Sequence, residues 1–171
     1  MDLDKVFLDY SGRKLRQLTG RISDCLDKLT YEQIWARGGD EQNAVGNLVL
    51  HLCGNVRQWI GFGVAGKPDI RVRDREFTAR GEIQPAELRG RLNDVVDEAI
   101  AAIESVTAAR LAEQIRVQAY EMTVLEAIYH VVEHFSQHTG QIIYATKLLT
   151  NADTGFYGHL YTPGGHEEKT P

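Results

Sequence analysis

Apolar residues recur every three or four positions along four stretches of the chain, the spacing that is typical of amphipathic helices. Each stretch is long enough to make a helix of several turns, and each has an opposite face of charged and polar residues. The four stretches cover Leu3 to Leu29, residues 42–62, Pro85 to Val106, and Val124 to Leu149. Because each apolar stripe has to be buried against another element, this pattern predicts an all-α four-helix bundle.

Local signals mark some of the helix ends. Thr123, followed three residues later by Glu126, predicts a capping box in front of the fourth helix. Pro85 suits the first turn of the third helix, where its missing N–H costs nothing. The apolar spacing is lost over residues 64–83, where charged residues, glycine and proline predict a long ordered loop. The only strand signal is a short piece around residues 115–119.

The composition is that of one globular domain. The chain has 171 residues, of which 43% are hydrophobic and 25% charged, with a net charge of −5. We expect a single domain over residues 1–161 and a disordered C-terminal tail over residues 162–171. The acidic balance argues against nucleic acid as a partner, because such proteins neutralise phosphates with clustered basic residues. No stretch approaches the roughly 20 apolar residues of a membrane span, so a membrane partner is not expected either.

The two cysteines, Cys25 and Cys53, fit no metal-binding spacing and lie among apolar residues. We interpret them as buried, reduced thiols, which predicts a cytoplasmic protein. Cys53 lies two positions from His51, so the two side chains point in nearly opposite directions on a helix. Cys53 is therefore not expected to share a site with that histidine.

Histidines are concentrated in the fourth helix, where His130, His134 and His138 fall within nine residues. On a helical wheel His134 and His138 border the apolar stripe, whereas His130 lies toward its flank. Residues four apart have Cβ atoms about 5–6 Å apart, so two imidazoles can reach one ion. His51, at the edge of the apolar stripe of the second helix, is the candidate for a third ligand. The alternative is that these are buried histidines bonded to nearby oxygen atoms.

Three imidazoles without a fourth protein ligand would leave a coordination position for water or substrate, as in catalytic metal sites. Imidazole suits zinc, nickel, copper and iron. The same stretch also contains an H-x-x-E-H string from His130 through Glu133 to His134, which supplies two ligands and a base in inverted zinc peptidases. On the wheel Glu133 points away from the apolar stripe. We therefore interpret it as a solvated residue or as a hydrogen-bond partner of a neighbouring ligand, and His130 as a packing or supporting residue.

Two segments of the chain resemble the DinB-like metal-binding bundles. These are residues 47–52 and residues 130–142, the latter with a His-x-x-x-His-x-Gly-Gln element. Residues 74–77 and 153–160 resemble an uncharacterised bacterial branch of that superfamily. The resemblance implies an up-down-down-up four-helix bundle, often a homodimer, with His51, His134 and His138 as the metal ligands.

Some members of the superfamily use the metal to activate mycothiol, bacillithiol or glutathione. The resemblance therefore implies a divalent metal, with zinc or nickel favoured, and a function as a metal-dependent thiol S-transferase that acts on small electrophiles. A metal-dependent hydrolase and a non-catalytic metal-binding module are the alternatives. A hydrolase would need a general base within reach, and the sequence does not identify one.

Four arginines of the expected loop could hold the anionic group of a thiol cofactor near the metal: Arg71, Arg73, Arg75 and Arg80. Of these, Arg75 is the candidate cofactor-binding residue. The alternative is local ion pairing with the acidic residues interleaved among them. The remaining histidines are not expected to take part, because His159 lies in a short aromatic segment that covers one end of the bundle and His166 belongs to the tail.

Overall fold

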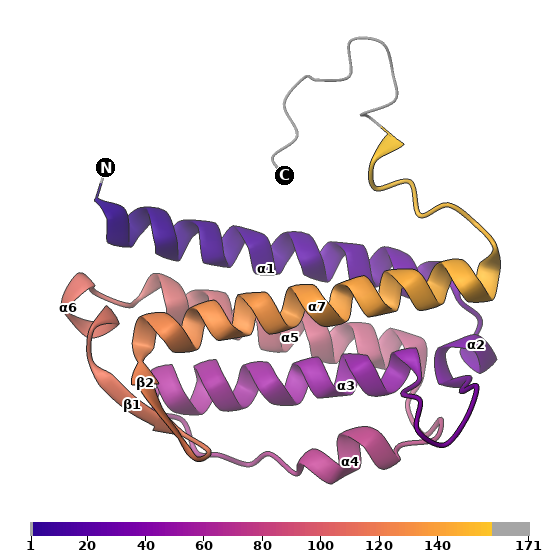
Figure 1. Cartoon of the computed structure of the whole chain (residues 1–171), viewed down its shortest axis with the longest axis horizontal. Helices are drawn as coiled ribbons and strands as arrows, with labels where there is room; N and C mark the ends of the chain where they lie inside the picture. Colours follow the sequence, from indigo (N-terminus) through magenta and orange to yellow (C-terminus); the bar gives the residue numbers. More distant parts are fainter. Residues whose placement is uncertain (1, 159–171) are drawn as a thin grey trace.

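The computed structural model describes residues 2–158 and contains the four expected long helices. These are α1 (Leu3–Lys28), α3 (Val45–Val56) with its continuation η1 (Arg57–Val64), α5 (Pro85–Glu104) and α7 (Val124–Thr150). They pack side by side into a bundle in which α1 and α7 run in one direction and α3 and α5 in the other (Figure 1). Both α1 and α3 contact α5 and α7. The predicted all-α, up-down-down-up bundle is confirmed.

The core of the bundle is formed by the periodic apolar positions. Its largest side chains with almost no exposed surface include Leu15, Ile22, Leu52, Leu92, Ile128 and Phe135. Both cysteines are buried and neither forms a disulfide. Among the residues that the structure describes, no helix is long and apolar enough to cross a membrane.

The predicted ends of α5 and α7 are close to those observed. Helix α7 begins after Thr123 with a complete capping box, in which Thr123 and Glu126 each accept a hydrogen bond from the other's backbone N–H. It ends at Thr150, and the following residue, Asn151, has a left-handed backbone conformation and donates its backbone N–H to the carbonyl oxygen of Lys147. Pro85 occupies the first turn of α5. These local signals were sufficient to predict where α5 and α7 begin, because each depends on residues within one helical turn.

The second helix differs from the prediction at both ends. It begins at Val45 rather than residue 42, because Asn47 accepts a hydrogen bond from the backbone N–H of Ala44 (3.1 Å) and so fixes the first turn. It then continues beyond residue 62 as the π-helical segment η1. Gly63 lies in this segment, and a Cβ there would be only 2.5 Å from Val117 Cγ2, so its small size lets residues 114–123 pack closely.

The prediction of a loop over residues 64–83 was partly wrong, because this segment contains the short helix α4 (Arg73–Thr78). Contacts from distant residues hold that helix. Asn47 donates to the carbonyl oxygens of Glu76 (2.9 Å) and Ala79 (3.1 Å), and Arg37 donates to that of Phe77 (2.8 Å). A six-residue helix stabilised in this way leaves no periodic apolar signal.

Three further short elements complete the fold, and two of them, the helices, were not predicted. These are α2 (Tyr31–Trp35), α6 (Ala108–Leu111) and an antiparallel pair of strands, β1 (Gln114–Val117) and β2 (Tyr120–Thr123). The strand signal near residues 115–119 corresponds to β1 and the turn after it. The expected tail over residues 162–171, together with His159 and His166, lies outside the described residues, so the predicted boundary at residue 161 stays a prediction.

Candidate metal centre

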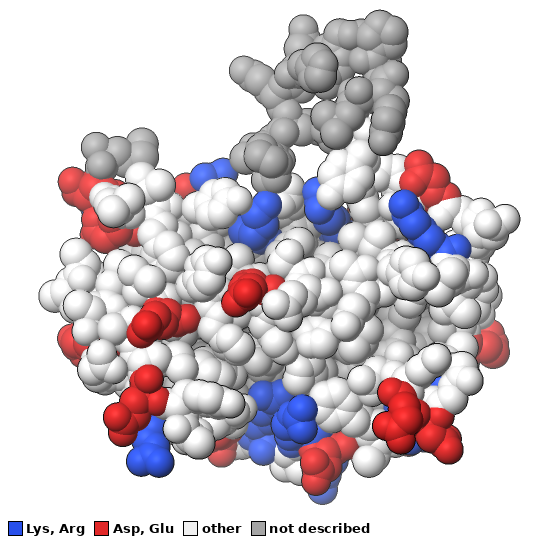
Figure 2. Space-filling model, in the orientation of Figure 1, with Lys and Arg blue, Asp and Glu red and all other residues white. Residues whose placement is uncertain are grey.

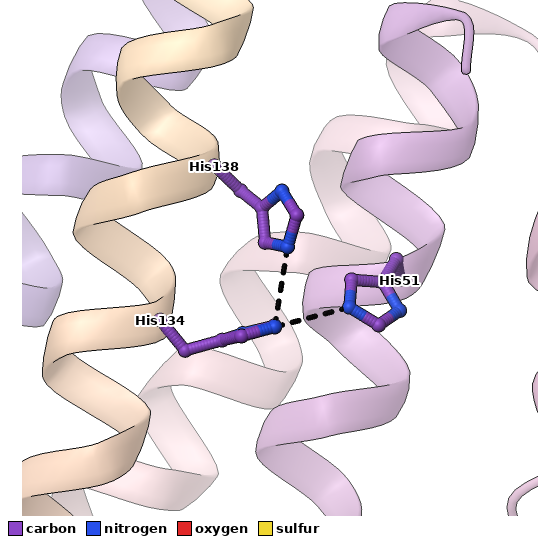
Figure 3. A group of neighbouring side chains, drawn as sticks. All are labelled: His51, His134 and His138. Carbon is purple, nitrogen blue, oxygen red and sulfur yellow. Dashed lines mark hydrogen bonds between the residues drawn. The ribbon is translucent and has the colours of Figure 1, made fainter. Parts of the chain in front are cut away.

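Three histidines from two helices meet between α3 and α7 (Figure 3). His51 comes from α3, whereas His134 and His138 are one turn apart on α7. The Nε2 atom of His134 lies 3.1 Å from His51 Nε2 and 3.1 Å from His138 Nε2. One ring nitrogen of each histidine can be chosen so that all three lie within 4.8 Å of one another. The structure thus brings together the three residues that the sequence singled out.

The spacing of these nitrogens is compatible with a shared ion. His134 Nε2 has either one proton or one lone pair in the ring plane, so it can complete only one good hydrogen bond. It nevertheless lies at 3.1 Å from two other nitrogens. Two nitrogens bound at about 2.0–2.1 Å to a tetrahedral zinc ion are roughly 3.3 Å apart. The donor set therefore fits a transition metal.

His51 is oriented by a buried ion pair from the segment around α4. Its Nδ1 lies 3.0 Å from Glu76 Oε2, and Arg71 binds both carboxylate oxygens of Glu76 at 2.7 and 2.8 Å. The side chains of Arg71 and Glu76 are only 4% and 9% exposed. Burial opposes ionisation of Glu76, but the hydrogen bonds from Arg71 and His51 outweigh it and lower its pKa. A carboxylate at this position favours the proton on Nδ1 and leaves the Nε2 lone pair free for a metal.

The two triad histidines of α7, His134 and His138, have weaker support. His138 Nδ1 lies 2.7 Å from Oε1 of Gln141, an exposed residue one turn further along. Nδ1 of His134 is buried and has no hydrogen-bond partner in the described part of the chain. Burial, followed by the neighbouring His138 and His51, lowers the pKa of His134 to about 3. Burial also lowers the pKa of His138, so both rings are neutral at pH 7 and have a lone pair to donate.

A cavity of about 640 Å³ opens beside His51 and His134, and we call it the histidine cavity. Its wall includes Asn55, Trp59 and His130, together with residues of the strand pair. Asn55 is one turn after His51, is 4% exposed, and its Oδ1 has no hydrogen-bond partner. The Trp59 and His130 rings lie 4.2 Å apart. The cavity wall thus combines aromatic rings with polar side chains next to the triad.

Two neighbours of the α7 histidines lie outside the triad. His130 packs against Trp59, with its ring centroid 5.6 Å from that of His134, and burial lowers its pKa. Glu133 is exposed, as the wheel indicated. It has no contact with the triad; the carboxylate that binds a triad histidine is instead Glu76, which sequence reasoning missed. The available signals were the acidic residues in the segment that follows α3 and the resemblance of residues 74–77 to a branch of the DinB-like superfamily, and neither assigned a role to Glu76.

The four arginines considered as anion-binding residues have separate positions. Arg71 is paired with Glu76 and lines the histidine cavity, as does Arg73, whose guanidinium lies 4.9 Å from the Phe77 ring centroid. Arg80 donates to the carbonyl oxygens of Phe77 and Ala79. Arg75 lines a different cavity, on the other side of the Arg71–Glu76 pair. Basic side chains gather over the segment that leads into α4 (Figure 2).

Comparison with known proteins agrees with this architecture. A family described as "protein of unknown function (DUF1572)" matches residues 2–158. The chain belongs to the DUF1572 family. DUF1572 is a DinB-like family, and the resemblance to DinB-like bundles seen in the sequence is confirmed. No curated protein matches the chain by sequence.

Solved structures share the fold of this DUF1572 protein. A DinB-like protein (YjoA) from Bacillus subtilis aligns with a TM-score of 0.66 and 14% identity over 86% of this chain and 97% of its own. A conserved protein from Enterococcus faecalis gives a TM-score of 0.64 and 14% identity over 89% and 99% of the two chains.

A histidine-to-alanine mutant of a mycothiol-dependent maleylpyruvate isomerase gives a TM-score of 0.63 and 14% identity over 79% of this chain. The alignment covers 60% of the isomerase, so that enzyme is considerably longer. At these identities the three matches show a common fold.

Proposed function

We propose that His51, His134 and His138 bind a divalent transition metal ion, zinc or nickel, and that the protein is a thiol S-transferase that acts on small electrophiles. The observation that carries the proposal is the convergence of three imidazole Nε2 atoms, two of which are freed for a metal by an oxygen atom bound at Nδ1. The fold shared with a mycothiol-dependent isomerase supports the choice of a thiol.

A divalent ion held by three imidazoles favours the thiolate form of a thiol that occupies its remaining coordination position. The residues of the chain would then bind and orient the rest of the ligand. Asn55 and Trp59 are almost fully buried in the cavity wall, whereas the ring of Tyr120 in the same wall is 58% exposed and offers a flat surface to a ligand. Arg73, on the rim of the same cavity, can pair with an anionic group.

A hydrolase is the second candidate, and the carboxylates near the site argue against it. Glu76 already accepts hydrogen bonds from His51 and Arg71, so it is a poor general base. Glu126 lines the histidine cavity but is occupied by the capping box of α7. Glu121, the remaining carboxylate of that cavity wall, is exposed and forms no hydrogen bond with a triad histidine.

The test is thiol binding to cobalt-substituted protein. Bacillithiol, mycothiol or glutathione should produce a sulfur-to-metal charge-transfer band in the parent and in His130→Ala, but not in His138→Ala. Conjugation of a model electrophile should depend on the same thiol. Metal binding without a band for any of the three thiols, and without conjugation, would favour the non-catalytic metal-binding module.

We also propose that the protein forms a homodimer through α1 and α7. Large apolar side chains on these helices are exposed, among them Leu3, Tyr10, Tyr129, Tyr144 and Leu148. Charged side chains are sparse over the middle of this face (Figure 2). Light scattering should give twice the 19.2 kDa of one chain, and a mass of one chain would contradict the proposal.

We also propose that the protein is located in the cytoplasm, where Cys25 and Cys53 stay reduced.

A further inference from the structure

We propose that a second cavity, separated from the histidine cavity by the Arg71–Glu76 pair, binds a small organic anion with an apolar body. This arginine cavity lies among α3, α5 and the segment around α4, and its volume is about 330 Å³. That volume is at the lower end of the range for small-molecule sites, about 300–1,000 Å³. The proposal concerns a separate cavity and does not depend on the proposed function of the histidines.

The wall of the arginine cavity has an apolar part beside its charged residues. Leu50 and Cys53 of α3 form part of it, and Ile83 closes it beside α5. Ile70 and Val72 line the cavity as well, although they are 78% and 54% exposed. A ligand with an apolar body would remove part of this surface from water, which is a favourable term in binding.

Arginines from four parts of the chain converge on the same cavity: Arg57 of η1, Arg71, Arg75 of α4 and Arg91 of α5. Arg71 is neutralised by Glu76, and Arg91 forms an exposed pair with Glu87 at 2.6 Å. Arg57 and Arg75 form no ion pair or side-chain hydrogen bond with any residue in the described range 2–158.

The one other carboxylate in the wall does not offset these charges. Asp69 already accepts hydrogen bonds from the Gln58 side chain (2.8 Å) and from the backbone of Arg71 (3.1 Å). The cavity therefore has an excess of positive charge, and the guanidinium groups of Arg57 and Arg75 have their donors available for a carboxylate or a phosphate.

The arginine charges also affect the Cys53 thiol, which is part of the cavity wall. Arg57 and Arg91 line the cavity together with Cys53. Burial raises the pKa of Cys53 to about 12, and the positive charges of Arg57 and Arg91 oppose that shift. The thiol stays protonated at pH 7, which makes Cys53 part of the binding wall and not a nucleophile. The proposal thus gives Arg75 an anion-binding role in a cavity separate from the histidines, whereas the sequence suggested such a role near the metal.

Phenyl phosphate is a suitable probe, because it joins a compact anion to a flat apolar ring. Calorimetric titration of the full chain should show binding in the millimolar range or tighter. Arg57→Gln and Arg75→Gln should each weaken it about tenfold, because each removes a charge-assisted hydrogen bond. Arg16→Gln is the matched control, since Arg16 is exposed on α1 and lines neither cavity. It should bind like the parent.

Two further probes separate the parts of the proposal. Inorganic phosphate should bind more weakly than phenyl phosphate, and benzyl alcohol should not bind measurably. Absence of phenyl phosphate binding, or equal binding by the Arg57→Gln/Arg75→Gln double variant, would overturn the site. Equal affinity for the two phosphates would overturn the assignment to an organic anion.

Discussion

The two halves of the histidine cluster are built in different ways. His134 and His138 lie one turn apart on α7, so the geometry of a single helix sets their relative position. His51 lies on α3, and its ring is fixed by Glu76, which is 25 residues away along the chain and is itself bound by Arg71. The first half depends on local spacing and the second on a tertiary contact.

The halves also differ in how firmly they are held. The Glu76 side chain is only 9% exposed and is itself bound by Arg71, whereas the Gln141 contact to His138 is exposed. A buried, charged hydrogen bond is worth more than an exposed neutral one, because water does not compete with it. We therefore expect the α3 half to be the more sensitive to changes in supporting residues.

Removal of a metal-binding histidine should lower metal affinity more than any other change. The loss should be equally large for a histidine of α3 and a histidine of α7. His51→Ala and His138→Ala should each lower metal affinity by more than about 100-fold, the upper end of what orienting partners alone contribute. Elemental analysis after dialysis measures the retained metal. His130→Ala is the control and should retain it. Loss of metal in His130→Ala but not in His138→Ala would favour the H-x-x-E-H interpretation instead.

The local half of the site could be predicted from sequence, and so could the long helices. Helical spacing placed His134 and His138 on one face and His130 at its flank, and the capping box of Thr123 and Glu126 located the start of α7. His51 was identifiable as the third member because it borders an apolar stripe that a bundle must turn inward.

The support of His51 could not be predicted in the same way. Glu76 lies in a six-residue helix that forms because Asn47 and Arg37 bind its carbonyl oxygens, and no local pattern encodes these contacts. The charged residues around Glu76 instead indicated a solvated loop. The two cavities likewise appear only when α3, α5 and the segment around α4 are packed together.

Neutralising Glu76 should have the next largest effect. Glu76→Gln should lower metal affinity about 10–100-fold, because it weakens the hydrogen bond that fixes the His51 ring. It should also destabilise the fold by about 3 kcal/mol, since Arg71 loses its buried counter-charge. Metal competition and urea unfolding measure the two effects. Glu133→Gln, an exposed carboxylate next to His134, should change neither; equal effects in both variants would contradict the assigned role of Glu76.

Gly54→Ala tests the support of His51 without removing a polar group. A Cβ at this position would overlap Glu76 Oε1 and lie 2.7 Å from its Cδ and 3.0 Å from Arg71 Nε. Gly54→Ala should therefore displace the pair and lower metal affinity about tenfold. Gly61→Ala, further along the same continuous helix, has no atom within 4 Å of its Cβ. If the two variants bind metal equally well, close packing of Glu76 on α3 is not needed for the site.

The burial of His134 on α7 should make the metal-free protein less stable as the pH falls below about 6.5. Folded His134 has a pKa of about 3, against 6.5 for an unperturbed histidine, so the unfolded chain binds more protons between these values. The contribution of His134 to the free energy of unfolding should fall by about 1 kcal/mol between pH 7.5 and 5.5. Urea unfolding of the parent and of His134→Gln at both values measures this difference. Parallel losses in the two proteins would show that His134 is not the group responsible.

The smallest effect is expected from Gln141, the exposed counterpart of Glu76. Its side chain orients His138 through a single neutral hydrogen bond of 2.7 Å, and water can replace it. Gln141→Ala should lower metal affinity by no more than about threefold, against about 10–100-fold for Glu76→Gln. Competition with a coloured chelator compares the two variants directly. If Gln141→Ala matched Glu76→Gln, the two halves would be held equally firmly, and burial of the supporting group would not decide how much it contributes.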